Sequence, residues 1–142
     1  MQDPITAITL QITFKKADFL NIISAWNNID RSIFLMHYLI DFIYPFVYGR
    51  LMYLLILDLS KKSQTTDQKL ALADLTYIPA LAAVSDLLEN TLHLLMVGSY
   101  IEVEALPVAA AAFFSIIKWS NLFGCVLVLI IAYLRQGLKK AS

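Results

Sequence analysis

Ionisable and polar side chains recur at helical spacing inside three stretches of the chain that are otherwise apolar. A helix advances about 100° per residue, so side chains three, four or seven positions apart share one face. The side chains that share a face in this way are His37, Asp41, Tyr44 and Tyr48 in the first stretch, Asp86, Glu89, Asn90 and His93 in the second, and Lys118 in the third, where Ala111, Ser115, Leu122 and Cys125 accompany it. Each stretch therefore predicts a helix with one polar side and one apolar side.

The charged members of this set have a cost that indicates where they lie. A charged side chain inside a bilayer costs about 2.5–3.5 kcal/mol on insertion scales, and it almost always faces the interior of a helix bundle. At about 1.5 Å per residue, Asp41, Glu89 and Lys118 lie at one level, roughly 12–13 Å from the outer ends of their helices. We therefore expect these three side chains to meet in the interior, within one buried polar cluster.

Two interpretations of this cluster are open. In the structural one, Lys118 neutralises Asp41 or Glu89, and the polar contacts hold together helices that have no hydrophobic reason to associate in lipid. In the functional one, the cluster is a proton or ion path, a small-ligand pocket or a catalytic centre, because three carboxyl groups against one lysine invite shifted pKa values. We favour the structural interpretation.

The two histidines could belong to a metal or haem site. His37 and His93 come out level with each other on different helices, as the ligands of such a site must. A pair without further ligands is more typical of polar packing, so we expect no metal and no cofactor. The sequence has no glycine-rich phosphate loop and no serine in a nucleophile-elbow motif, and its one cysteine, Cys125, is expected to be a packing residue. Whether the chain is an enzyme stays open.

The elements that position these residues are long and apolar. Of the 142 residues, 59% are hydrophobic and 15% are charged, whereas soluble domains have about 45–50% apolar and about 25% charged residues. Three stretches, at about 33–57, 73–97 and 109–134, reach the roughly 20 residues that a transmembrane helix needs. We expect an all-α integral membrane protein: a three-helix transmembrane bundle plus an N-terminal amphipathic segment, in a single domain over 1–142.

Pro45 lies inside the first predicted span. It lacks the N–H group that would bond the carbonyl oxygen of Asp41, four residues earlier. The expected result is a kink with a free carbonyl group beside an acidic side chain. Pro79, early in the second span, predicts a similar kink.

The first thirty residues follow different patterns. Apolar residues alternate with polar ones from Ile8 to Phe14, a period-two pattern that predicts a short strand or an extended segment. From Asp18 to Trp26 the apolar residues fall at helical spacing, which predicts an amphipathic helix within residues 1–30. This helix either lies on the membrane surface, with Trp26 at the headgroup level, or packs against the bundle. The sequence favours neither alternative.

The distribution of basic residues predicts the orientation. With three spans, the hydrophilic connection at 58–69 and the C-terminal tail share one side, and together they hold six lysines and arginines. The opposite side holds Lys15, Lys16 and Arg31, and the short acidic connection at 98–105 holds no basic residue. The positive-inside rule therefore places the C-terminus in the cytoplasm.

Short motifs in each span suggest a resemblance that covers the chain from about residue 14 to 134. The motifs are Trp26, then Asp41-Phe42-Ile43-Tyr44-Pro45 with Tyr48, then Asp86-Leu87-Leu88-Glu89-Asn90, and then Lys118-Trp119. Their order resembles that of small uncharacterised multi-pass membrane proteins with an Asp-Phe-x-x-Pro first span, an Asp-x-x-Glu-Asn second span and a Lys-Trp third span. The resemblance implies a membrane fold of this kind, and it implies no activity.

These observations favour a structural or accessory membrane protein with a buried polar network. One alternative is a unit that transports protons, ions or small solutes, which with three spans per chain needs an oligomer. Another is a membrane enzyme that acts on a lipid-soluble substrate through Asp41, Glu89 or His93. The expected partner is the lipid bilayer, and a homo-oligomer or a larger membrane complex stays open. The net charge of zero predicts no nucleic-acid partner.

Overall fold

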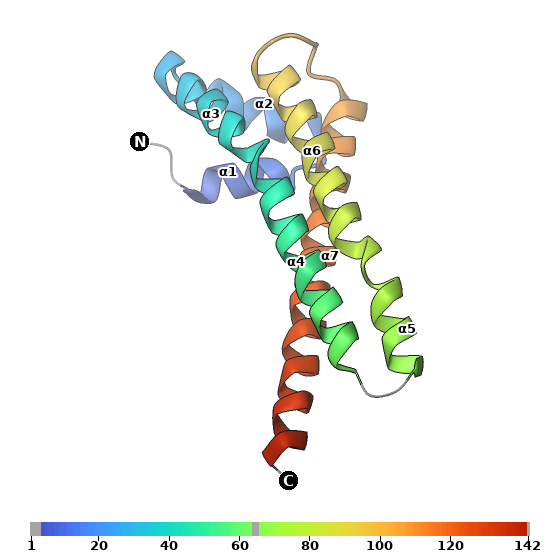
Figure 1. The fold of residues 1–142 in the computed structure, drawn as a ribbon. Coiled ribbons are helices and arrows are strands. Elements are labelled where there is room, and N and C mark those ends of the chain that lie inside the picture. The colour runs from blue at the N-terminus through green and yellow to red at the C-terminus, as the bar shows by residue number, and fades with distance from the viewer. Residues whose placement is uncertain (1–3, 64–65, 142) are drawn as a thin grey trace.

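A computed structural model describes residues 4–63 and 66–141, and this part of the chain is helical with no strand (Figure 1). Its helices are α1 (Pro4–Gln11), α2 (Lys16–Ser24), α3 (Asn28–Asp41), α4 (Tyr44–Lys62), α5 (Thr66–Asp74), α6 (Tyr77–Val97) and α7 (Ala105–Ala141). The prediction of an all-α fold is confirmed.

Three helical runs in the described residues are long and apolar enough to cross a membrane. They are Asn28–Lys62, which comprises α3 and α4, Leu72–Val97, which is mainly α6, and Ala105–Arg135, which is most of α7. Each run contains one of the three stretches that the sequence predicted. The number of such helices is therefore confirmed, and the bilayer itself is taken up below as a proposal.

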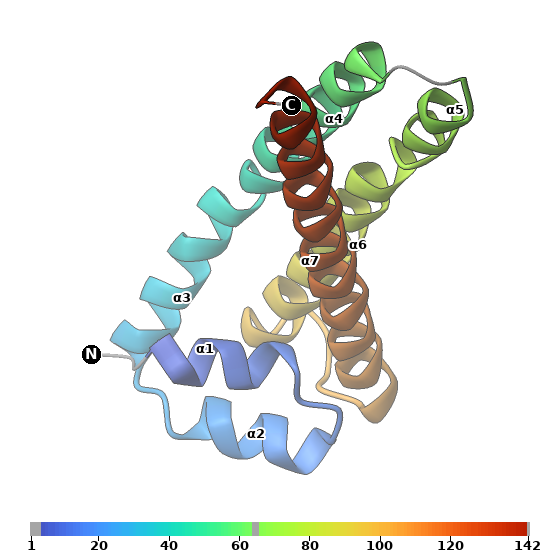
Figure 2. The same ribbon diagram turned by 90° about the horizontal axis from the view of Figure 1, so that it is seen from below.

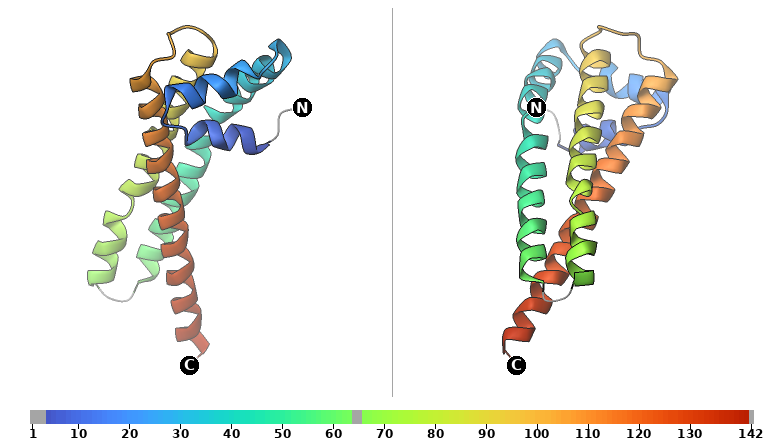
Figure 3. Two further views of the ribbon diagram at one scale, coloured as in Figure 1. Left: turned by 180° about the vertical axis from the view of Figure 1, so that it is seen from behind. Right: turned by 45° about the vertical axis from the view of Figure 1, so that its right-hand side comes forward.

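The second long helix, α6, is the centre of the assembly, since it packs against both α4 and α7. Figure 3 shows α7 crossing α4 and α6, in front of them in the left view, with α5 beside the lower part of α4. The end of α4, the start of α5 and the end of α7 lie at one end of the molecule, and α1, α2 and the connection at 98–104 lie at the other (Figure 1). The basic residues near the end of α4 and those near the end of α7 thus lie at the same end of the molecule, as expected for three spans.

The first long run is broken near Pro45. The N–H of Phe42 donates to the carbonyl oxygen of Tyr38 at 3.0 Å, that of Ile43 donates to Ile40 at 2.9 Å, and α4 then begins at Tyr44 with Pro45 in its first turn. Figure 1 shows the bend between α3 and α4 at this point. The expected kink is therefore present, and it takes the form of a short break between two helices.

A second break precedes Pro79. The chain leaves α5 at Asp74 and enters α6 at Tyr77, so Pro79 lies in the first turn of α6. A proline is tolerated in a first turn, because the backbone N–H groups there have no partner within the helix. The direction of the chain changes before Pro79, between the two helices.

The expectation of a strand or an extended segment from Ile8 to Phe14 is wrong for residues 8–11, which are helical, while residues 12–14 form a turn and a short connection after α1. Residues Pro4–Gln11 form α1, in which Leu10 is buried in the apolar core while Ile8 is exposed. A lone strand leaves its backbone N–H and C=O groups unpaired, whereas a helix satisfies its own. The described chain contains no strand with which this segment could pair, so the segment forms a helix despite its alternating pattern.

The predicted amphipathic helix is α2, and it packs against the bundle. Phe19 and Ile23 on α2, and Trp26 just after it, are buried in one apolar core with Phe34 and Met96. Figure 2 shows α1 and α2 side by side across one end of the long helices. Of the two alternatives left open by the sequence, packing against the bundle is the one that the structure contains.

An ion pair and a capping box fix the ends of this N-terminal layer. Lys16 Nζ lies 3.0 Å from Glu104 Oε1, which joins α2 to the connection before α7. Asn27 accepts a hydrogen bond from the Asp30 N–H at 2.9 Å, and the Asp30 carboxylate accepts from the Asn27 N–H, so α3 begins at a defined residue. The layer closes the core that lies between α3, α6 and α7.

Candidate functional site

The Lys118 ammonium group lies between two carboxyl groups in the interior. Its Nζ atom is 2.7 Å from Glu89 Oε2 and 3.1 Å from Asp86 Oδ1. All three residues are buried, and Glu89 is 0% exposed. Opposite charges this close reduce the cost of keeping each charge away from water.

The pairing follows from how α6 and α7 are built. Asp86 and Glu89 are three residues apart on α6, so both point toward the same neighbour. On α7, the side facing α6 has the small buried residues Ser115 and Ala111, respectively one and two turns before Lys118. Small residues let two helices approach closely, and the lysine can then reach both carboxyl groups.

Tyr48 connects the first long run to Asp86 and Lys118. Its hydroxyl group donates to Asp86 Oδ2 at 3.0 Å, while the other oxygen of Asp86 faces Lys118. Tyr48 is on α4, Asp86 on α6 and Lys118 on α7. Asp86 therefore receives hydrogen bonds from two other helices and joins all three long runs.

Asn90, one turn further along α6, joins this helix to the end of α3. Its Nδ2 atom donates to the backbone carbonyl oxygen of Asp41 at 3.2 Å. This carbonyl is the one that Pro45 cannot bond, because proline has no N–H group. The amide of Asn90 thus satisfies an acceptor that the break between α3 and α4 exposes.

His93 lies beyond Glu89 in an aromatic environment. Its Nδ1 atom is 3.8 Å from Glu89 Oε1, and the residue is 1% exposed. The rings of Phe19 and Tyr38 each have their centroid 6.0 Å from that of the imidazole, and the Phe19 ring is parallel to it. Residues from α2 and α3 therefore enclose the histidine.

Asp41 does not join Lys118, and this corrects the expected three-residue meeting. Its carboxyl group is partly exposed and lies 3.7 Å from His37 Nε2 on the preceding turn. The lysine takes Asp86 as its second partner instead. The break after Asp41 changes the direction of the helix, so the 100° count cannot be carried from α3 into α4.

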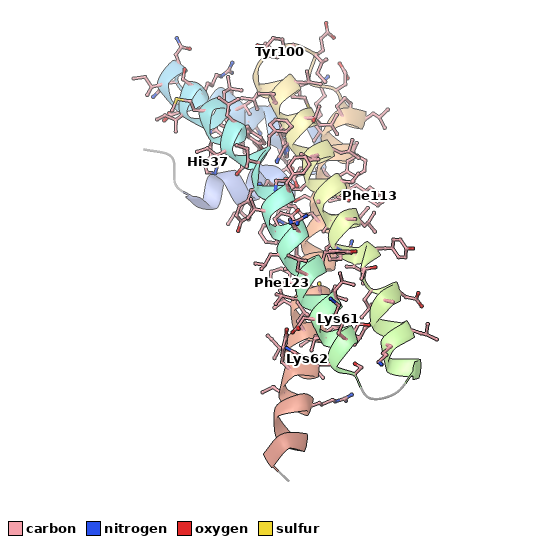
Figure 4. The ribbon with its side chains drawn as sticks, viewed as in Figure 1. His37, Lys61, Lys62, Tyr100, Phe113 and Phe123 are labelled. Atoms are coloured by element: carbon pink, nitrogen blue, oxygen red, sulfur yellow. The ribbon has the colours of Figure 1, made fainter. Side chains whose placement is uncertain are left out.

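His37 and Tyr44 also lie outside the buried set. The His37 side chain is 67% exposed, and Figure 4 shows it on the outer side of α3. Tyr44 is exposed at the first position of α4, with its ring 5.5 Å from that of Tyr48. Both residues belong to the predicted polar face, but one precedes the break and the other begins the helix after it, so neither reaches α6.

Two buried residues at the site were not assigned to it by sequence reasoning. Tyr38 is enclosed beside His93, and Ser85 is buried next to Asp86. The spacing of Phe34 and Tyr38, four residues apart, was the available signal for an inward aromatic face. The sequence prediction relied on the polar residues of α3, such as His37, and these lie on the exposed face of the helix.

A cavity of about 360 Å³ lies at the end of α6, away from the charged cluster. It opens to the surface, and its lining consists of Ile23, Arg31, Met96 and the residues at 99–103. No residue of the Lys118 cluster lines it. In the described part of the chain, no group of three or more His, Cys, Asp or Glu side chains is arranged to hold a metal ion.

No family model, curated protein or solved structure matches this chain. The resemblance to small multi-pass proteins therefore stays a prediction, and the interpretation of the site depends on its own geometry.

Proposed function

We propose that the chain is a structural or accessory membrane protein, a three-helix transmembrane bundle held together by a buried network of charged and polar side chains. The observation that supports this most is the position of Lys118 Nζ between Asp86 and Glu89. Helices in lipid gain nothing from hydrophobic burial against each other, so interhelical polar contacts and close packing must hold them. Each long run contributes at least one side chain to this network.

The outward surface supports the bilayer as the partner. Large apolar side chains of the long helices, such as Leu39, Phe46 and Phe123, are exposed on the isolated chain. Figure 4 shows Phe113 at the right-hand edge of the bundle, where it is exposed. Soluble monomers rarely expose large continuous apolar surfaces, so exposed apolar side chains along several helices fit a lipid environment.

The arrangement of charge supports a cytoplasmic C-terminus. Lys61 and Lys62 at the end of α4 lie at the same end of the molecule as the C-terminal part of α7 (Figure 4). Arg135 lies near the end of the third apolar run. Basic residues next to the ends of membrane helices favour the cytoplasmic side.

The transport and enzyme alternatives receive less support. Each needs a water-filled route or a substrate pocket beside the carboxyl groups, and the cavity at the end of α6 is lined by other residues. The carboxyl groups of Asp86 and Glu89 are instead in contact with Lys118 and Tyr48. A buried cluster whose charged groups are in contact with one another fits a role in holding helices together.

The test is proton flux in liposomes that contain the purified protein and a trapped pH-sensitive dye. We expect the wild type to leak protons no faster than empty liposomes, and Glu89→Gln to behave in the same way. A flux above the empty control that disappears in Glu89→Gln would establish transport and overturn the structural proposal.

A further inference from the structure

Two buried polar atoms face each other without a hydrogen bond. Glu89 Oε1 and His93 Nδ1 are 3.8 Å apart, beyond hydrogen-bond distance. Neither atom has a hydrogen-bond partner among the residues that the structure describes. Buried polar atoms nearly always have a partner, so a pair of them side by side needs a physical reason.

The charges around this pair do not balance. Asp86 and Glu89 bring two carboxyl groups, and Lys118 is the only lysine or arginine among the buried residues of the described chain. With both carboxyl groups ionised and His93 neutral, one negative charge is left without a counter-charge in the interior. A buried charge without a partner is strongly disfavoured.

The neighbouring helices supply no second cation. From α4, the neutral Tyr48 hydroxyl group faces Asp86, and from α3 and α2 the rings of Tyr38 and Phe19 face His93. Asp41, also on α3, adds a further carboxyl group on that side, and its histidine neighbour is exposed. Both oxygens of Asp86 already accept hydrogen bonds, from Lys118 and Tyr48, whereas Glu89 Oε1 and His93 Nδ1 have no partner. Within the described residues, a neutralising proton therefore fits best at Glu89 or His93.

We propose that Glu89 and His93 form a proton-binding site that holds one exchangeable proton in addition to those of Lys118. The proton comes from water, and it resides either on Glu89 Oε1, giving a neutral carboxyl group, or on His93 Nδ1, giving an imidazolium ion beside a carboxylate. Both forms contain the same number of protons and both make the cluster neutral. A small rotation of either side chain then brings the two atoms into a hydrogen bond.

This site goes beyond the proposed function, because a proton bound at Glu89 and His93 needs no path from one side of the membrane to the other. If the protein has the structural role proposed above, the bound proton stabilises the bundle. If the protein transports protons instead, the same site can still hold a proton. Its presence and the absence of flux are therefore separate findings, and each can fail without the other.

Infrared spectra of the wild type in lipid at neutral pH test for the carboxyl form. We expect a carbonyl stretch from a protonated carboxyl group that shifts on deuteration, is lost in Glu89→Gln and is kept in the control Asp41→Asn. If Glu89→Gln fails to fold, carboxyl-¹³C glutamate in the wild type assigns the band, since the other glutamates, Glu102 and Glu104, are exposed.

Nitrogen NMR of ¹⁵N-histidine protein tests for the imidazolium form. The variant His37→Gln leaves His93 as the only histidine, and His37 is exposed and outside the cluster. A protonated Glu89 in the infrared spectrum, or a protonated His93 in the NMR spectrum, supports the site. An ionised Glu89 together with a neutral His93 at neutral pH overturns it.

Discussion

The amide of Asn90 donates to the backbone carbonyl oxygen of Asp41 across 3.2 Å, and this contact replaces the hydrogen bond that Pro45 cannot make. The break between α3 and α4 would otherwise leave a carbonyl group of the first run unpaired. The contact also joins α6 to α3, and α3 carries Tyr38, whose ring lies beside His93. The Asn90 side chain thus supplies the hydrogen bond that is missing at the break and connects two helices.

Replacing Asn90 with Leu is expected to lower the free energy of unfolding by about 1–3 kcal/mol, because a partly buried acceptor loses its donor. The matched control is Asn121→Leu. The Asn121 amide donates to Ile117 within its own helix, so its loss breaks no contact between helices. Unfolding in detergent provides the measurement, and equal effects of the two variants would contradict the role given to Asn90.

Pro45→Ala should weaken the dependence on Asn90. Alanine supplies an N–H group that can bond the Asp41 carbonyl oxygen from within the helix. The cost of Asn90→Leu is therefore expected to be smaller in the Pro45→Ala background than in the wild type, by about 0.5 kcal/mol or more. A double-mutant cycle measures this difference, and an unchanged cost would mean that the proline and the amide act independently.

Tyr48→Phe removes the hydroxyl donor to Asp86 and keeps the ring. We expect a loss of about 1–3 kcal/mol in the free energy of unfolding, since one oxygen of a buried carboxyl group is left unpaired. Tyr44→Phe is the control, because Tyr44 is exposed on the same helix. A loss in the control as large as that in Tyr48→Phe would show that the buried hydroxyl group has no special role.

The orientation can be tested with single cysteines at the two ends of the molecule. Lys61 and Tyr100 lie at opposite ends (Figure 4), and Cys125→Ala removes the native thiol. In intact cells, a membrane-impermeant thiol reagent should label Tyr100→Cys, and it should label Lys61→Cys only after the membrane is permeabilised. Labelling of Lys61→Cys from outside would reverse the predicted topology.

The sequence was most informative where a helix runs without interruption. Glu89 and Lys118 lie within α6 and α7, so face and depth could be counted from the helical repeat, and the two side chains are 2.7 Å apart. The count failed for Asp41 because a break of two residues follows it. Pro45 indicated that the helix would break, but the direction in which α4 continues depends on packing between helices.

The N-terminal layer could be predicted only in part. The helical spacing from Asp18 to Trp26 indicated α2, and it could not say whether lipid or protein covers the apolar face. The alternation from Ile8 to Phe14 indicated a strand or an extended segment, and that prediction failed for residues 8–11 because a strand depends on a partner elsewhere in the chain. Local patterns report which residues are apolar, and contacts between distant segments decide how that surface is buried.

The central claim, that Lys118 holds the helices together through buried carboxyl groups, is tested most directly by a double-mutant cycle with Asp86. Lys118→Met alone is expected to cost about 3–5 kcal/mol, because it leaves buried carboxyl groups without their cation. Lys118→Met combined with Asp86→Asn should cost less than the sum of the single changes, by about 0.5–3 kcal/mol. Additive costs, within about 0.3–0.5 kcal/mol, would show that the two residues do not interact and would contradict the account.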